Sequence, residues 1–166
     1  GLGHAKDFDK KTKKELLAML HVPSSERQFI MYEALRKGAT VDELFELTKI
    51  KHYFIQQMKE LVEEEESLMQ YKGEVPPVEV LRQAKLDGFA DKYLSELLGV
   101  TEEEIRDART KEGIVEGWEG VHVSATPDSA YYFSSYHIKD QSPCSDNKKI
   151  MILGGGPNRI GQGIEF

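Results

Sequence analysis

The sequence predicts a mostly α fold of about six or seven helices, followed by an irregular C-terminal segment and a single β-strand. Three observations lead to this prediction. Apolar residues recur at three- and four-residue spacing from Lys11 to about Glu112, glycines punctuate this region, and turn residues with alternating patterns replace the helical pattern after Gly113. Hydrophobic residues make up 39% of the chain, which is enough apolar material for a core.

Capping boxes mark two helix starts. In this motif a threonine hydroxyl accepts from the backbone N–H three residues later, while a glutamate at that later position accepts from the backbone N–H of the threonine. Thr40 with Glu43 and Thr101 with Glu104 have this spacing, so helices are predicted to begin just after each threonine. Glycines suited to a positive φ follow the helical stretches, and these are Gly38, Gly73, Gly99 and Gly113.

The longest helix is predicted from about Lys51 to Tyr71. Its apolar residues recur with helical spacing, which predicts one core-facing stripe. The members of this stripe are Phe54, Met58, Leu61, Val62, Leu68 and Met69. The acidic run Glu63–Glu66 lies in the same helix, and we interpret it as a solvated face rather than a metal site.

Three consecutive apolar residues, Tyr53, Phe54 and Ile55, stand at the start of this helix. Consecutive helical residues point about 100° apart, so at least one of the three faces away from the core stripe. We expect that residue to form a contact between copies of the chain, because exposed apolar patches mark interfaces. The alternative is that neighbouring helices bury all three, since aromatic clusters at helix starts often pack under loops.

Extended structure is predicted after Gly113. Trp118, the alternating Val121–Val123 and the aromatic run Tyr131–Phe133 indicate extended segments and turns, forming a wrap or linker rather than another helix. The polar stretch Lys139–Asn147 is typical of an exposed connection between structural units. A domain boundary is therefore predicted near its end.

A short apolar run, Lys149–Leu153, ends abruptly in glycines, a pattern typical of a buried parallel strand followed by a tight turn. We expect an α/β domain to begin here that the chain does not complete. Such a glycine turn either approaches an anion or packs a strand closely against a helix, and this one lacks the Lys-Ser/Thr ending of a phosphate-binding loop. Its glycines are Gly154, Gly155, Gly156 and Gly161.

Composition narrows the function classes. The formal net charge of −7 and the pI near 5.3 argue against nucleic acid as a partner, since phosphate backbones attract clustered Lys and Arg. Cys144 is the only cysteine, which excludes an intrachain disulfide and fits a reducing, cytoplasmic setting. No apolar run approaches the roughly 20 residues that span a bilayer, so no membrane association is expected. The five histidines lack metal-ligand spacing and no nucleophile motif is present, so we expect neither a metal site nor catalytic residues.

Several segments resemble one enzyme family, in the family's order. Lys149–Phe166 closely resembles the opening of the second synthetase half of the carbamoyl phosphate synthetase large chain. Gly88–Lys92, followed by Thr101–Arg106 and Arg109, is similar to the family's Gly-Phe-Ser-Asp-Lys and Arg-x-x-Arg segments. Gly1–Gly3 resembles the end of the first synthetase half. The first helices of the family's connecting domain are resembled by Arg27, Phe29, Ala34–Gly38, Leu47–Thr48 and Phe54.

The resemblance implies an architectural role. Residues 11–147 would form the helical connecting and oligomerisation domain, with the end of the first synthetase half at 1–10 and the start of the second at 148–166. Gly163 and Glu165 match positions beside the tunnel that joins the family's active sites. Neither ATP site is expected in this chain, so it should bind no cofactor and be non-catalytic by itself.

The resemblance also implies a parent enzyme. In the family, the large chain makes carbamoyl phosphate from bicarbonate, ammonia released from glutamine and two ATP, using Mg or Mn, for arginine and pyrimidine biosynthesis. The implied partners are the two synthetase halves, the small glutaminase subunit and further large chains.

One segment departs from the family pattern, and one alternative stays open. Val121–Pro127 replaces the family's Val-Asp-Thr-Cys-Ala-Ala-Glu-like run, with His122 at the position of the family's Asp. The competing class is an independent helical protein-interaction or helix-turn-helix binding module. The unfinished strand and the negative net charge speak against that class.

Overall fold

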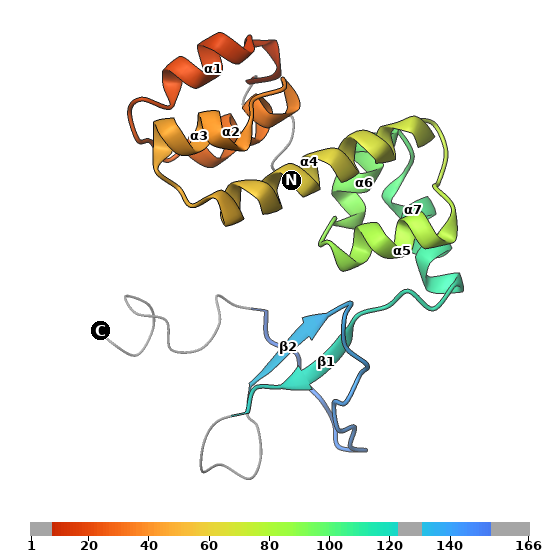
Figure 1. Cartoon of the computed structure of the whole chain (residues 1–166). Coiled ribbons are helices and arrows are strands. Elements are labelled where there is room, and N and C mark those ends of the chain that lie inside the picture. The colour runs from red at the N-terminus through yellow and green to blue at the C-terminus, as the bar shows by residue number, and fades with distance from the viewer. Residues whose placement is uncertain (1–7, 123–130, 154–166) are drawn as a thin grey trace.

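A computed structural model describes residues 8–122 and 131–153. Within these residues the chain forms seven α-helices and a two-stranded sheet (Figure 1), which confirms the predicted mostly α fold. The helices are α1 (Lys13–Met19), α2 (Arg27–Arg36), α3 (Val41–Thr48), α4 (His52–Leu68), α5 (Val78–Leu86), α6 (Asp91–Leu98) and α7 (Glu102–Lys111). Shorter elements are the 3-10 helices η1 (Phe8–Lys10) and η2 (Met69–Tyr71) and the strands β1 (Gly117–Gly120) and β2 (Tyr132–Ser135).

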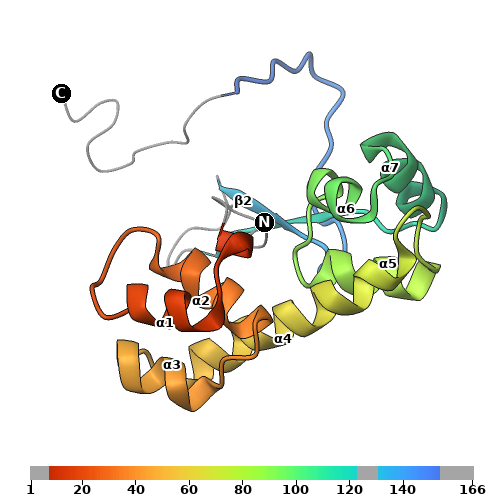
Figure 2. The same cartoon turned by 90° about the horizontal axis from the view of Figure 1, so that it is seen from above.

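Helix α4 joins two helical lobes, as Figures 1 and 2 show. In the N-terminal lobe, α1–α3 pack with the first half of α4 around a core that includes Leu16, Leu44 and Ile55. In the C-terminal lobe, α5–α7 pack with the end of α4 around a second core that includes Leu81 and Leu98. Because the cores are separate, the orientation of the lobes depends on α4 and on the contacts beside it.

The two lobes share a repeated three-helix unit that the sequence analysis did not detect. Helix α3 corresponds to α6 residue for residue, fifty positions later, and α4 begins fifty positions before α7. No gap is needed between residues 27–55 and 77–105. The identical pairs are Ala34 and Ala84, Gly38 and Gly88, Leu44 and Leu94, Glu46 and Glu96, Leu47 and Leu97, and Ile55 and Ile105. All of the paired alanines, Leu44, Leu94 and both isoleucines are fully buried, so the repeat preserves the core positions.

Both predicted capping boxes are confirmed. The hydroxyl of Thr40 accepts from the backbone N–H of Glu43 at 3.1 Å, and the Glu43 carboxylate accepts from the Thr40 N–H at 2.7 Å. Thr101 and Glu104 make the same pair of bonds. A third box that the sequence analysis overlooked starts α1. The four predicted helix-ending glycines have positive φ, as does a fifth, Gly88.

The segment after α7 is extended, as predicted, but its pairing was not anticipated. β1 and β2 form an antiparallel hairpin in which Trp118 lies opposite Ser134 and Gly120 opposite Tyr132. Gly117 has no room for a side chain, because a Cβ there would lie 2.4 Å from the carbonyl oxygen of Ile138. The chain after the hairpin therefore lies directly over its open end.

The strand predicted at Lys149–Leu153 is wrong for this structure. Ile150–Leu153 forms no strand and is 85–89% exposed. A strand needs hydrogen-bonding partners along its edges, and the part of the chain that the structure describes places none beside this run. Lys139–Asn147 is irregular and largely exposed, as predicted. Among the described residues, no helix has the length and apolar character required to cross a membrane.

The repeat generates a stability prediction at the end of α3. Lys49 has φ 56° in the left-handed region, whereas its counterpart after α6 is Gly99, with φ 73°. A side chain strains this conformation, so Lys49→Gly should raise the free energy of unfolding by about 0.5 kcal/mol despite the loss of an exposed pair with Glu46. The reverse change, Gly99→Lys, should lower it by about 1 kcal/mol, because the added Cβ meets only open space and the backbone alone is tested. Urea denaturation measures both, and an unchanged midpoint for Gly99→Lys would contradict the argument.

Candidate interaction surface

The three apolar residues at the start of α4 divide between core and surface. Ile55 is fully buried in the N-terminal core, while Tyr53 and Phe54 are 67% and 60% exposed. The two exposed rings meet edge to face, with their centroids 5.4 Å apart. Of the three residues, only Tyr53 and Phe54 are thus available for the expected contact between copies, and that contact stays a prediction.

A hollow lies beside this aromatic pair. Its volume is about 280 Å³, and Met31, Ile50 and Met58 supply apolar walls next to Phe54. Arg27 and Gln28 complete the lining. An exposed aromatic residue beside an apolar hollow is an arrangement that suits insertion of a side chain from another surface.

The repeated unit indicates that the fold does not require these aromatic residues. Fifty positions later, Glu103 and Glu104 occupy the places of Tyr53 and Phe54 at the start of α7. Glu104 completes a capping box there, and the helix begins at the same point in the unit. Acidic residues stand at the equivalent helix start in the second lobe, so a helix can begin at this point of the unit without the aromatic pair.

A buried carboxylate connects the two lobes beside α4. The side chain of Glu65 is fully buried, and its Oε2 accepts from the hydroxyl of Tyr32 on α2 at 2.8 Å and of Tyr93 on α6 at 2.7 Å. Arg36 on α2 pairs with the other carboxylate oxygen, and it also pairs with Glu33 and with Glu66. Three helices from both lobes therefore meet at one carboxylate.

The interpretation of Glu63–Glu66 as a solvated face is wrong at Glu65. The helical period places Glu65 three residues from both Val62 and Leu68, which are buried on the same side of α4. The charge is satisfied by Arg36 and two tyrosines, as a buried ion requires. Burial and the Glu65 carboxylate together raise the pKa of both Tyr32 and Tyr93, so both hydroxyls stay protonated donors.

The neighbouring Glu64 has a different environment. It is half-buried, and burial, followed by a hydrogen bond to Asp87 and the charge of that residue, raises the pKa of Glu64 to about 8. Asp87 ends α5, so this carboxyl pair links α4 to the C-terminal lobe. At neutral pH the contact depends on a proton held between two acidic groups.

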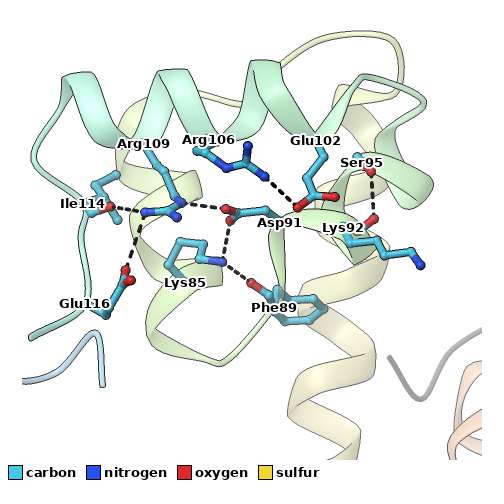
Figure 3. Close-up of polar contacts among 10 residues, drawn as sticks. All are labelled: Lys85, Phe89, Asp91, Lys92, Ser95, Glu102, Arg106, Arg109, Ile114 and Glu116. Atoms are coloured by element: carbon cyan, nitrogen blue, oxygen red, sulfur yellow. Dashed lines mark hydrogen bonds and ion pairs between the residues drawn. The ribbon is translucent and has the colours of Figure 1, made fainter. Parts of the chain in front are cut away.

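A second polar cluster fixes the C-terminal lobe (Figure 3). The ammonium of Lys85 donates to the Phe89 carbonyl and to Asp91 Oδ1, each at 2.7 Å. Arg109 on α7 donates through Nε to Asp91 Oδ2 at 2.8 Å and through Nη1 to the Ile114 carbonyl at 3.1 Å. Burial alone would raise the pKa of Asp91, but the bonds from Lys85 and Arg109 outweigh it, and the pKa is lowered.

This cluster gives a physical role to the segment that resembles the family motif. Asp91 of Gly88–Lys92 binds α5 to α7 through its two carboxylate oxygens. Of the two arginines, Arg109 joins the cluster, whereas Arg106 only pairs with Glu102 on the exposed side of α7. Asp91 and Arg109 of this segment thus stabilise the packing of α5 on α7.

The same cations hold the extended segment. The ring of Tyr136 lies 4.9 Å from the Lys85 ammonium and 5.7 Å from the Arg109 guanidinium. His137 Nε2 lies 2.8 Å from the Leu86 carbonyl. These contacts attach the chain that follows β2 to the C-terminal lobe.

The remaining predicted site residues lie outside the described residues. They are the glycine turn, Gly154, Gly155, Gly156 and Gly161, and the two tunnel positions, Gly163 and Glu165. Within residues 8–122 and 131–153, His, Cys, Asp and Glu side chains form no group of three that could hold a metal ion.

The fold and its polar clusters define a helical scaffold domain with an exposed aromatic surface. The family model described as "Carbamoyl-phosphate synthetase large chain, oligomerisation domain" matches residues 1–113. The chain therefore belongs to this family, as its motifs indicated.

Relatives from archaea, bacteria and plants have the same family name. The carbamoyl phosphate synthase large chain of Archaeoglobus fulgidus is 40% identical over all of this chain and 16% of its own length. That of Pseudomonas aeruginosa is 42% identical over 89% of this chain and 14% of its own length. The arginine-specific, chloroplastic large chain of Arabidopsis thaliana is 40% identical over 92% of this chain and 13% of its own length. The chain thus spans about one seventh of the length of these relatives.

The lobe connection leads to a stability prediction. Glu65→Gln should lower the free energy of unfolding by about 3 kcal/mol, because it removes the charge that compensates a buried arginine. The matched control is Glu66→Gln, which removes a half-exposed partner of the same Arg36 and should cost less than about 1 kcal/mol. Chemical denaturation of both variants measures the difference. Equal costs would contradict the proposed role of Glu65.

Glu64 gives a prediction about pH. Its pKa is higher in the folded chain, about 8, than the ordinary value of 4.5, so the folded state holds an extra proton between these values. Stability should consequently fall as pH rises from about 5 to about 8. Glu64→Gln should remove this part of the pH dependence, whereas Glu63→Gln, on the exposed side of α4, should leave it unchanged. Melting temperatures across this range are the measurement, and a parallel profile for Glu64→Gln and the unaltered chain would refute it.

Proposed function

We propose that this chain is the connecting and oligomerisation domain within a carbamoyl phosphate synthase large chain. The family match over residues 1–113 is the observation that carries the proposal. The relatives from archaea, bacteria and plants support it, since all have the large-chain name. The polar clusters at Glu65 and Asp91 support a rigid spacer, because they fix helices from different parts of the chain.

The parent would be a ligase that makes carbamoyl phosphate from bicarbonate, glutamine-derived ammonia and two ATP, with Mg or Mn at its ATP sites. The arginine-specific relative supports arginine biosynthesis, and we extend the proposal to pyrimidine biosynthesis. Residues 1–10 and 148–166 would belong to the two synthetase halves, with Gly163 and Glu165 beside the tunnel. A small glutaminase subunit would be a further partner, and the single cysteine supports a cytoplasmic location.

The domain's own role would include association with a second large chain through Tyr53 and Phe54. Three observations support this surface: the exposure of both rings, the apolar hollow beside them, and the acidic residues at the equivalent helix start in the second lobe. An isologous contact would place an aromatic ring of each copy against the hollow of the other.

Sedimentation of the chain across a wide concentration range tests this surface. Tyr53→Glu with Phe54→Glu introduces the residues that the second lobe uses, so the helix should still form. Self-association should weaken by about tenfold or more, because aromatic side chains dominate such interfaces. Val22→Glu is the control, since it places the same charge at an exposed apolar residue elsewhere in the N-terminal lobe.

Two outcomes would count against the proposal in different ways. Association that the double variant leaves unchanged would remove Tyr53 and Phe54 from the interface. A natural reading frame that continues into no synthetase sequence would instead overturn membership of a large chain and favour an independent binding module.

A further inference from the structure

Exposed apolar side chains are concentrated outside the helical lobes. Among the described residues, ten of the fourteen large hydrophobic residues that are exposed lie between Val115 and Leu153, and the helical part from Phe8 to Gly113 has the other four. The helical lobes thus bury nearly all of their own apolar surface, whereas the extended segment does not. Exposed apolar side chains gathered on one segment indicate an interface.

The hairpin contributes a defined part of this surface. Side chains of cross-strand partners share a face, and successive residues alternate between faces. Phe133 lies opposite Glu119, so these two share one face, and Val121 and Tyr131 continue it beyond the last pair of the ladder. Phe133 and Tyr131 are 45% and 47% exposed. We call these four residues the outer hairpin face.

The opposite end of this face is already covered. Gly117 lies on the same side of β1 as Glu119, and the backbone of residues 138–140 lies within 2.7 Å of the position its Cβ would take. Gln141 then donates to the Trp118 carbonyl along the edge of β1. Within residues 8–122 and 131–153, the chain packs over this face at the end near Gly117, while the rings of Phe133 and Tyr131 stay exposed.

The described contacts between the hairpin and the helical lobes do not reach its aromatic end, at Val121 and Tyr131. Two-stranded sheets are marginally stable alone and need a third strand or a packed face. Its attachments to the C-terminal lobe lie at its base, through Tyr136, His137 and the bond from Arg109 to Ile114. Figure 1 shows the hairpin standing apart from the helices.

We propose that the outer hairpin face docks onto another part of the same large chain. This inference rests on the proposed function, and the relatives, about seven times longer than this chain, supply the polypeptide that such docking needs. The same extended segment continues into Ile150–Leu153, whose four exposed apolar side chains also require burial. Two exposed apolar stretches on one segment, together with the length of the relatives, favour a partner in the same polypeptide over a second copy.

The chemistry of the face specifies its partner. Phe133, Tyr131 and Val121 require an apolar surface, and Glu119, which shares their face, is partly exposed among them. Glu119 already lies 4.0 Å from His122 Nε2, and a carboxylate buried in such an interface needs cationic partners. The docking site should therefore be an apolar patch that presents a Lys or Arg to Glu119 beside His122.

Hydrogen exchange compares the full-length large chain from the natural gene with the 166-residue chain. Peptides covering residues 117–121 and 131–135 should exchange at least about tenfold more slowly in the full-length protein, because docking must open before these amides exchange. Peptides from α2 and α6 should exchange alike in both. Equal exchange of the hairpin in the two proteins would overturn the proposal.

Variants of the full-length protein test the face itself. Phe133→Glu and the milder Phe133→Ala should each abolish the added protection, whereas Ser134→Glu, on the opposite face of the same strand, should retain it. Protection that appears only at high protein concentration would identify a second copy as the occupant and overturn docking within one chain. A natural gene that encodes no synthetase half would refute the proposed function, an outcome distinct from a full-length large chain whose hairpin is unprotected.

Discussion

The buried carboxylate of Glu65 is the interaction on which the arrangement of the two lobes depends. Each lobe has its own apolar core, and Leu61 of α4 packs against both, so hydrophobic burial alone fixes their mutual orientation only loosely. Hydrogen bonds are directional, and one carboxylate that accepts from Tyr32 and Tyr93 sets the distance and angle between α2 and α6. A buried ion pair adds little net stability, but it selects one geometry among those that apolar packing permits.

The repeated unit explains how so few residues build two lobes. Alanines before the interhelical turn and buried leucines and isoleucines recur fifty positions apart, while the surfaces differ. The first unit has exposed aromatic residues where the second has a capping glutamate, and the second has the Lys85, Asp91 and Arg109 cluster where the first has Leu35, Val41 and Lys59. The shared core makes the fold, and the differences leave an exposed aromatic pair on the first lobe and a polar cluster that holds the extended segment on the second.

Sequence patterns predicted the local structure well, because capping boxes and helix-ending glycines act over a few residues. They did not predict Glu65, since a run of four glutamates is normally solvated and only the stripe of Val62 and Leu68 indicated burial. The duplicated unit was not predicted because few of its positions are identical, and only a direct comparison of residues 27–55 with 77–105 reveals them. The pairing of β1 with β2 and the exposure of Ile150–Leu153 are set by tertiary structure, which local patterns do not specify.

The contacts of Glu65 constrain the length of α4. Its 17 residues extend about 26 Å, and both lobes pack against this one helix. Inserting a single residue between Ile55 and Glu65 would turn one lobe by about 100° against the other and withdraw the carboxylate from Tyr32. Even an insertion of two full turns, which returns Glu65 to the same side of the helix, would move its carboxylate about 10 Å away from Tyr32. The contacts of Glu65 therefore constrain the length of α4 between Ile55 and Glu65 more tightly than apolar packing within either lobe would.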